Sequence, residues 1–147
     1  MIAPLQLTQA VLPAMIERKF GRIVNITSAM VTTPRPLMTL SSAPRAGLTA
    51  AMKAISLEVA RHNVTINNIL PERADTYRQH YMALQVTERE GISYEEARAR
   101  QVESIAARRM GRPEEFGALC AFICSAHGGF ISGQNFHFDG GSYPALI

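Results

Sequence analysis

Three polar side chains near the start of the chain are of types that could bind a substrate oxygen: Ser28, Ser41 and Arg45. Ser28 follows the apolar segment 21–27, which predicts a short buried strand ending in hydroxyl groups. Ser41 precedes, and Arg45 lies in, the Ala-, Gly- and Leu-rich segment 42–62, which predicts a long buried helix. Hydroxyl groups can hydrogen-bond to an alcohol or carbonyl oxygen, and an arginine stays positively charged beside it. The pattern indicates a polar site where a strand ends and a helix begins.

The rest of the chain alternates helical and strand patterns. The predicted helices cover residues 2–18, 42–62, two segments within 75–109, and 113–125, and the predicted strands cover residues 21–27, 64–70 and 134–138. Within 75–109 a break is expected at residues 91–93, where Ser93 and Glu96 make a capping-box pattern. Because helices separate the strands, the connections should be right-handed crossovers within a parallel sheet. The expected fold class is therefore α/β, a parallel sheet with flanking helices.

Length and composition limit the class of protein. The chain has 147 residues, of which 47% are apolar and 18% charged, as expected for one globular domain with a real core. No apolar run approaches the roughly 18 residues of a membrane span, and the N-terminus has no signal-peptide pattern, so we expect a cytoplasmic location and no membrane partner. The net charge of +3 comes from scattered residues without a basic stripe, which argues against nucleic-acid binding.

The cysteines and histidines do not form a metal-binding pattern. Cys120 and Cys124 are four residues apart in an apolar run, too close for an unstrained disulfide, and are expected to be buried thiols. His127 lies beyond the expected helix end, so no second pair of ligands is near. The other histidines stand apart from any carboxylate cluster: His62, His80 and His137. We therefore expect no metal site.

Several segments, in this order, resemble the short-chain dehydrogenase/reductase family over nearly the whole chain. The main one is the spacing that puts Ser41 thirteen residues after Ser28 and Arg45 four residues later, where the family has a catalytic Ser and a Tyr-x-x-x-Lys. The other matching segments are residues 7–15, 63–71, 111–115 and 133–141. The resemblance implies a Rossmann-type fold, with residues 1–147 forming the C-terminal portion, the second half only, with about three strands.

The resemblance also implies roles for individual residues. Ser28 matches the catalytic serine, while Ser41 and Arg45 stand at the Tyr and Lys positions, where Arg45 could still hold a cofactor ribose. Pro71 matches the proline that ends the strand beneath the nicotinamide, and Thr76 matches a hydroxyl that touches the carboxamide. The implied cofactor is NAD or NADP, and the implied substrate is a small molecule.

The chain departs from the family pattern at Ser41, Arg45 and Glu72, and it lacks one motif of the family. Glu72 stands where glycine is usual after Pro71. A tyrosine, with an unperturbed pKa of about 10, can be brought toward neutrality by a neighbouring ammonium, whereas a serine hydroxyl such as that of Ser41 is a poor acid. The Gly-rich turn that binds the pyrophosphate of a dinucleotide is absent before Gly21, because only one helix precedes this residue. A truncated chain, a partial sequence and a shortened gene would all explain this.

Each site residue also has a purely structural interpretation. Ser28 could simply end a strand, Ser41 could be only a helix N-cap, and Arg45 could be a solvated first-turn residue. Glu72 could pair with Arg73 or Arg78 at the surface. A substitute phenol would require the segment after Pro71 to fold over the site and bring in one of the four tyrosines: Tyr77, Tyr81, Tyr94 or Tyr143.

These observations leave three hypotheses for function. The first is an NAD(P)-dependent oxidoreductase lineage acting on a small alcohol or carbonyl, of the 3-oxoacyl carrier-protein reductase type, and impaired at the Tyr and Lys positions. The second is a non-catalytic oligomerisation or binding subunit, and the third is a segment stable only when joined to another half. Apolar residues nearly encircle the 42–62 helix, which predicts a homo-oligomer, a dimer or tetramer, formed through this helix and the 2–18 helix: Leu48, Ala51, Met52, Ile55, Leu57 and Val59.

Overall fold

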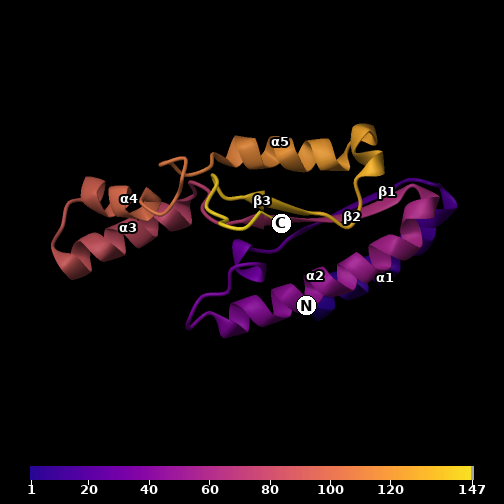
Figure 1. The fold of residues 1–147 in the computed structure, drawn as a ribbon, viewed down its shortest axis with the longest axis horizontal. Coiled ribbons are helices and arrows are strands. Elements are labelled where there is room, and N and C mark those ends of the chain that lie inside the picture. Colours follow the sequence, from indigo (N-terminus) through magenta and orange to yellow (C-terminus); the bar gives the residue numbers. More distant parts are fainter. Residues whose placement is uncertain (147) are drawn as a thin grey trace.

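The computed structural model describes residues 1–146, in which a three-stranded sheet lies between helices (Figure 1). In chain order the elements are α1 (Ile2–Glu17), β1 (Gly21–Ile26), α2 (Thr39–Val59), β2 (Val64–Pro71), α3 (Tyr77–Glu90), α4 (Tyr94–Val102), α5 (Pro113–Cys124) and β3 (Asn135–Phe138). Short 3-10 helices follow β1, α2 and α5, at Ala29–Val31, Ala60–His62 and Ala126–Phe130. The predicted α/β class is confirmed.

The sheet is parallel throughout, with the order β1-β2-β3. Gly21 of β1 is opposite Val64 of β2, and Asn68 of β2 is opposite Asn135 of β3. Residues 64–70 of the central strand are all buried, as expected for the middle strand of a parallel sheet that helices cover on both faces. Because the strands are parallel, their carboxyl ends meet at one edge of the sheet, and this is where the site lies.

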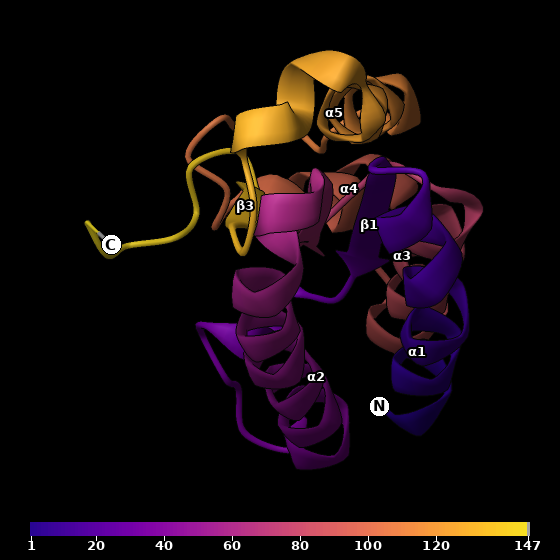
Figure 2. The same ribbon diagram turned by 90° about the vertical axis from the view of Figure 1, so that its right-hand side faces the viewer.

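Helices cover both faces of the sheet (Figures 1 and 2). The helices α1 and α2 lie together on one face, and α5 lies on the other. On the α1/α2 side, Leu48, Met52 and Val59 of α2 pack against Val64 and Ile66 of β2. Half-buried apolar side chains complete this core: Leu5, Leu12, Met15, Ile16, Ile23 and Ile55. The apolar residues that predicted a helix over residues 2–18 are therefore the ones that α1 packs against the core.

The pair α3 and α4 extends beyond the end of the sheet (Figure 1). The predicted break between them is confirmed. The helix α3 ends at Glu90, and its C-cap residue Gly91 has a φ of +67°, which favours glycine. The Ser93 hydroxyl then accepts a hydrogen bond from the Glu96 N–H at the start of α4. Arg98 of α4 forms a 2.6 Å ion pair with Asp75, just before α3, which ties α4 to the segment after β2.

Three sequence expectations are corrected by the fold. The helix α2 begins at Thr39 with Met38 as its N-cap, so the interpretation of Ser41 as an N-cap is wrong. The expectation that both cysteines are buried is also wrong: Cys120 is half-buried and Cys124 exposed, because α5 buries only the face that carries Ile123 and no layer covers its outer side.

A separate finding agrees with the sequence: of the helices within residues 1–146, none combines the length and apolar character needed to cross a membrane.

The third correction concerns the apolar face of α2. Leu48, Met52 and Val59 are 6%, 1% and 5% exposed and belong to the core, so they do not form an interface face. The exposed large apolar side chains on α2 are Leu40, in its first turn, at 94%, and Leu57, near its end, at 71%. On α1 the exposed apolar side chains are Ile2, Leu7 and Val11.

Candidate functional site

A cleft of about 720 Å³ opens at the carboxyl ends of β1 and β2. Its walls come from the loop after β1, the start of α2, and the α3/α4 pair. Four of the five residues predicted from the sequence line it: Ser28, Ser41, Arg45 and Pro71. The fold therefore brings together residues that are up to 43 positions apart in the chain.

Ser28 lies at the turn from β1 into the 3-10 helix Ala29–Val31. Its backbone is extended, and its Oγ accepts a hydrogen bond from the Met30 N–H at 3.2 Å. A hydroxyl carries one donor and two acceptor sites, so this contact leaves the O–H of Ser28 able to donate. Ser28 can therefore give a hydrogen bond to an oxygen atom in the cleft.

Ser41 and Arg45 are joined across the first turns of α2. The Nη1 of Arg45 donates to the backbone oxygen of Ser41 at 3.0 Å and to its Oγ at 2.5 Å. This is the i, i+4 relationship that places two side chains on one helix face. The guanidinium occupies one acceptor site of Oγ, so the hydroxyl of Ser41 keeps its O–H donor and one acceptor site for a ligand.

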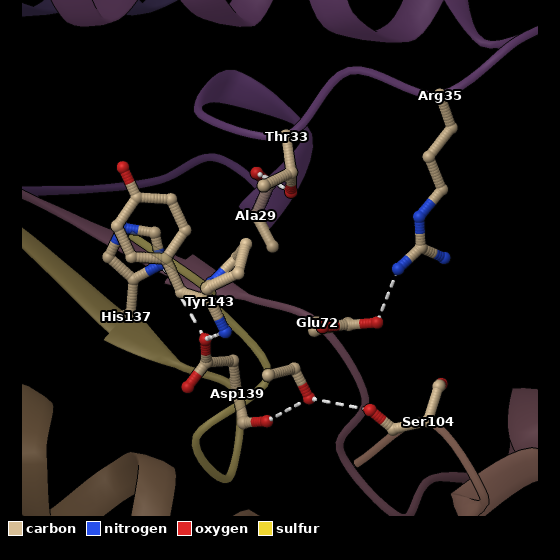
Figure 3. A pocket seen from close by; sticks show the side chains of 10 residues that line it. Ala29, Thr33, Arg35, Glu72, Ser104, His137, Asp139 and Tyr143 are labelled. Atoms are coloured by element: carbon tan, nitrogen blue, oxygen red, sulfur yellow. Dashed lines mark hydrogen bonds and ion pairs between the residues drawn. The ribbon is translucent and has the colours of Figure 1, made fainter. Parts of the chain in front are cut away.

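Glu72 follows Pro71 at the end of β2 and points back toward the loop after β1. Its carboxylate forms a 2.5 Å ion pair with Arg35, and its side chain is only 10% exposed (Figure 3). The alternative pairing of Glu72 with Arg73 or Arg78 is therefore wrong. The sequence could not indicate this contact, because Arg35 is 37 residues away in a loop without a periodic pattern.

Thr27 and Thr76 differ in their relation to the cleft. Thr27 lines it and is 6% exposed, and its Oγ1 has no hydrogen-bond partner among the described residues. A buried hydroxyl without a partner is costly, which suits a position that meets a ligand. Thr76, the N-cap residue of α3, is exposed and does not appear in the cleft lining. Thr76 is therefore the one predicted site residue that does not line the cleft with Ser28, Ser41, Arg45 and Pro71.

A second cavity of about 240 Å³ adjoins the cleft, and Ala29, Thr33, Arg35 and Glu72 line both (Figure 3). Its far wall is the turn after β3. The Asp139 carboxylate, 8% exposed, accepts hydrogen bonds from the backbone N–H groups of Gly141 at 3.0 Å and Tyr143 at 2.8 Å.

His137 also contributes to this far wall. Its Nδ1 lies 3.7 Å from Asp139 Oδ2, and its ring stacks on that of Tyr143 with centroids 4.1 Å apart (Figure 3). Sequence reasoning missed this group. The signal that was available is the spacing of His137 and Asp139, two residues apart and so directed to one side of the chain.

Positively charged side chains outnumber negatively charged ones in the cleft lining. Five arginines and two glutamates line it: Arg35, Arg45, Arg73, Arg78, Arg100, Glu72 and Glu90. Sequence reasoning predicted two helices within residues 75–109 but assigned none of their arginines to the site, because a helical pattern does not say which part of a helix borders a cleft.

The remaining titratable groups of the sequence analysis lie elsewhere. Within residues 1–146, none of the four tyrosines is part of the cleft lining. His80 lies beside a single carboxylate, with Nε2 3.3 Å from Asp75 Oδ1. The described part of the chain contains no group of three or more His, Cys, Asp or Glu side chains that could hold a metal ion.

Comparison with known proteins gives a consistent result. Residues 1–143 match the family described as enoyl-(acyl carrier protein) reductase. The NADPH-dependent reductase BacG of Bacillus subtilis is 35% identical over 132 residues, which cover 90% of this chain and 51% of that protein. The 3-oxoacyl-[acyl-carrier-protein] reductase FabG of Haemophilus influenzae is 31% identical over 137 residues, covering 93% of this chain and 52% of that protein.

Solved structures show the same fold. The crystal structure of YwfH, an NADPH-dependent reductase involved in bacilysin biosynthesis, superposes with a TM-score of 0.90 at 31% identity, covering 99% of this chain and 56% of that chain. The L-sorbose reductase of Gluconobacter frateurii superposes with a TM-score of 0.92 at 24% identity, covering 99% of this chain and 56% of that chain, a likeness of fold alone. The chain spans about half the length of the curated relatives it matches.

Proposed function

The chain belongs to the short-chain dehydrogenase/reductase family, an oxidoreductase lineage, and from this premise we propose that it takes part in NAD(P)-dependent reduction or oxidation of a small carbonyl or alcohol compound. We propose further that residues 1–147 correspond to the C-terminal portion of such a domain and that the proton-transfer step is weakened. The observation that carries the proposal is the meeting of Ser28, Ser41, Arg45 and Pro71 in one cleft at the carboxyl ends of parallel strands.

Ser28 would bind and polarise the substrate oxygen. Its O–H can donate into the cleft because the Met30 N–H uses only an acceptor site of the hydroxyl. A hydrogen bond that strengthens as negative charge develops on the oxygen lowers the barrier to hydride transfer. The buried hydroxyl of Thr27 offers a second contact for a ligand beside it.

Ser41 would orient the substrate but exchange a proton poorly. General acid catalysis is most effective when the pKa of the acid lies near the working pH, and an aliphatic hydroxyl beside one guanidinium is far from that range. Arg45 holds Ser41 through two hydrogen bonds and, being always protonated, cannot pass a proton on. This is the reason for proposing a weakened reaction.

The residues present fit one end of a nicotinamide dinucleotide. The cofactor would supply or accept the hydride; Arg45 would hold a ribose hydroxyl, and Pro71 would face the nicotinamide. The described strands offer no cradle for the pyrophosphate: β1 and β2 lead into Thr27-Ser28 and Glu72-Arg73, and within residues 1–146 no helix follows the two glycines after β3. Thr76, exposed and outside the lining, would need a movement of the segment after β2 to reach the carboxamide.

The test is to restore the family pair. We expect the change of Ser41→Tyr with Arg45→Lys, in the chain fused to the dinucleotide-binding half of a relative, to raise the rate of ketone reduction by NADPH by about a hundredfold over the fused parent. The matched control is Ala43→Tyr with Arg45→Lys, which places the phenol on an exposed position outside the cleft lining. Equal rates for the parent and both variants would refute the proposal.

A non-catalytic oligomerisation or binding subunit is the second candidate. It is supported by the Ser41 substitution and by exposed apolar side chains on α1 and α2: Ile2, Leu7, Val11 and Leu57. Apolar side chains on adjacent helices suit a homo-oligomeric contact, a dimer or tetramer in this proposal. A chain that forms a stable oligomer and gains no activity from the restored pair would favour this candidate.

A further inference from the structure

The side chains of two arginines in the cleft lining have neither an ion pair nor a hydrogen bond. Of the five, Arg35 is neutralised by Glu72 at 2.5 Å and Arg100 by Glu90 at 2.8 Å, and Arg45 is held by the neutral Ser41. For the side chains of Arg73 and Arg78, no hydrogen bond or ion pair is present among residues 1–146. The cleft therefore carries uncompensated positive charge at Arg45, Arg73 and Arg78, and of these three only Arg73 and Arg78 have guanidinium groups without a hydrogen bond.

The two carboxylates closest to them in the sequence, Glu72 and Asp75, do not neutralise them. Asp75 lies between Arg73 and Arg78, but its Oδ1 forms a 2.6 Å ion pair with Arg98 and lies 3.3 Å from His80 Nε2. Glu72, adjacent to Arg73, is held by Arg35 on the other side. The acidic groups that could have paired with the two arginines are thus engaged elsewhere.

The backbone that carries the two arginines is anchored. The carbonyl of Arg73 accepts a hydrogen bond from the Gly111 N–H at 3.1 Å, and the Gly111 carbonyl accepts one from the Asp75 N–H at 2.8 Å. Arg78 lies in the first turn of α3, where the carbonyl of the next residue, Gln79, accepts a 2.9 Å hydrogen bond from Gln101 of α4. The backbone at these two positions is thus held in place, while both guanidinium groups remain available to a ligand.

We propose that Arg73 and Arg78 form an anion-binding site in the cleft, which takes the carboxylate or phosphate group of a substrate whose carbonyl lies at Ser28. The planar guanidinium forms bidentate hydrogen bonds with the oxygens of a carboxylate or phosphate group. A cleft of about 720 Å³ has room for a small oxo-acid that spans both groups. Naming the carbonyl compound as carrier of the anion rests on the proposed function; the anion site itself does not.

The test compares one carbon skeleton with and without its charge. Dissociation constants of 2-oxobutanoate and of uncharged butanone would be measured by ligand-observed NMR, with the 147-residue chain in the assembly that it forms. For 2-oxobutanoate we expect weakening of at least about tenfold in Arg73→Gln and in Arg78→Gln. Butanone should bind equally to all variants. Arg61→Gln, which removes the same charge from an exposed position outside the cleft lining, should bind both compounds like the parent.

Two further measurements make the result decisive. Adenosine 2′,5′-bisphosphate distinguishes the source of the anion: if only its binding falls in the variants, the site stands and serves a cofactor phosphate. Unchanged melting temperatures would show that the variants are folded, as expected for side chains without partners. Equal binding of both anions to the parent and to the two variants, or binding of neither anion to the parent, would overturn the proposal. The test measures binding and needs no turnover, so its result can be interpreted even if the proposed catalytic function is wrong.

Discussion

The carboxylate of Glu72 and the guanidinium of Arg35 form a 2.5 Å ion pair that joins the end of β2 to the loop after β1. Both residues line the cleft and the smaller cavity, so the pair stands where the two spaces meet (Figure 3). Glu72 is nearly buried, whereas Arg35 is 46% exposed. The loop at residues 32–38, which has few backbone hydrogen bonds of its own, is therefore attached to the sheet by a side chain.

Loss of this ion pair should loosen the loop. We expect Glu72→Gln to speed amide hydrogen exchange at Thr33 and Met38, whose N–H groups bond to Ala29 and Arg35 carbonyls, by several-fold. A double-mutant cycle with Arg35→Gln should give a coupling of about 1 kcal/mol. Glu58→Gln, an exposed glutamate on α2, is the control. Unchanged exchange in Glu72→Gln would show that the loop is held by other contacts.

Binding of a dinucleotide should be weak in the 147-residue chain. We expect neither NAD(H) nor NADP(H) to bind measurably in the micromolar range, because the described strands offer no Gly-rich cradle for the pyrophosphate. Thermal-shift titration measures this, since a ligand that binds the folded state raises its melting temperature. A saturable rise with either nucleotide would contradict this prediction.

Association should depend on the exposed apolar residues of α1 and α2. We expect Leu57→Glu and Val11→Glu each to lower the mass measured by light scattering at micromolar concentration, because each places a charge on an apolar surface. Met52→Glu tests a different property: Met52 is 1% exposed, so this change should unfold the chain. A parent that is monomeric, or an oligomer whose mass neither surface change alters, would place the interface elsewhere.

The N-terminus of α5 should show a pH-dependent contribution to stability. Hydrogen bonds from Arg109 and from the Arg112 N–H lower the pKa of Glu115 to about 2. Because the folded-state pKa is below the unfolded value, the stabilisation is present above about pH 4.5 and is lost as the pH falls toward 2. Glu115→Gln should therefore lower the melting temperature at pH 7, and the difference from the parent should shrink across this window. Glu114→Gln, at the neighbouring exposed position, should have little effect; equal effects of the two changes would show that the specific contacts of Glu115 are not responsible.

The sequence by itself determined the elements and their order. Periodicity located the helix of Leu5, Leu12 and Met15, and β-branched residues located the central strand, because these patterns reflect burial that repeats along one element. The alternation of helices and strands then required parallel pairing. The spacing from Ser28 to Arg45 also placed three polar residues at the end of one strand and the start of the next helix, and the structure has all three in one cleft.

Only the tertiary structure decided which distant groups meet. The partner of Glu72 is Arg35 rather than Arg73 or Arg78, and Asp75 is engaged by Arg98, so the side chains of Arg73 and Arg78 are left without a partner in the cleft. Likewise Leu57 is exposed while Leu48 is buried, although both belong to the same apolar helix. The physical reason is the same in each case: ion pairing and burial depend on distances between elements, whereas a sequence pattern records only the repeat within one element.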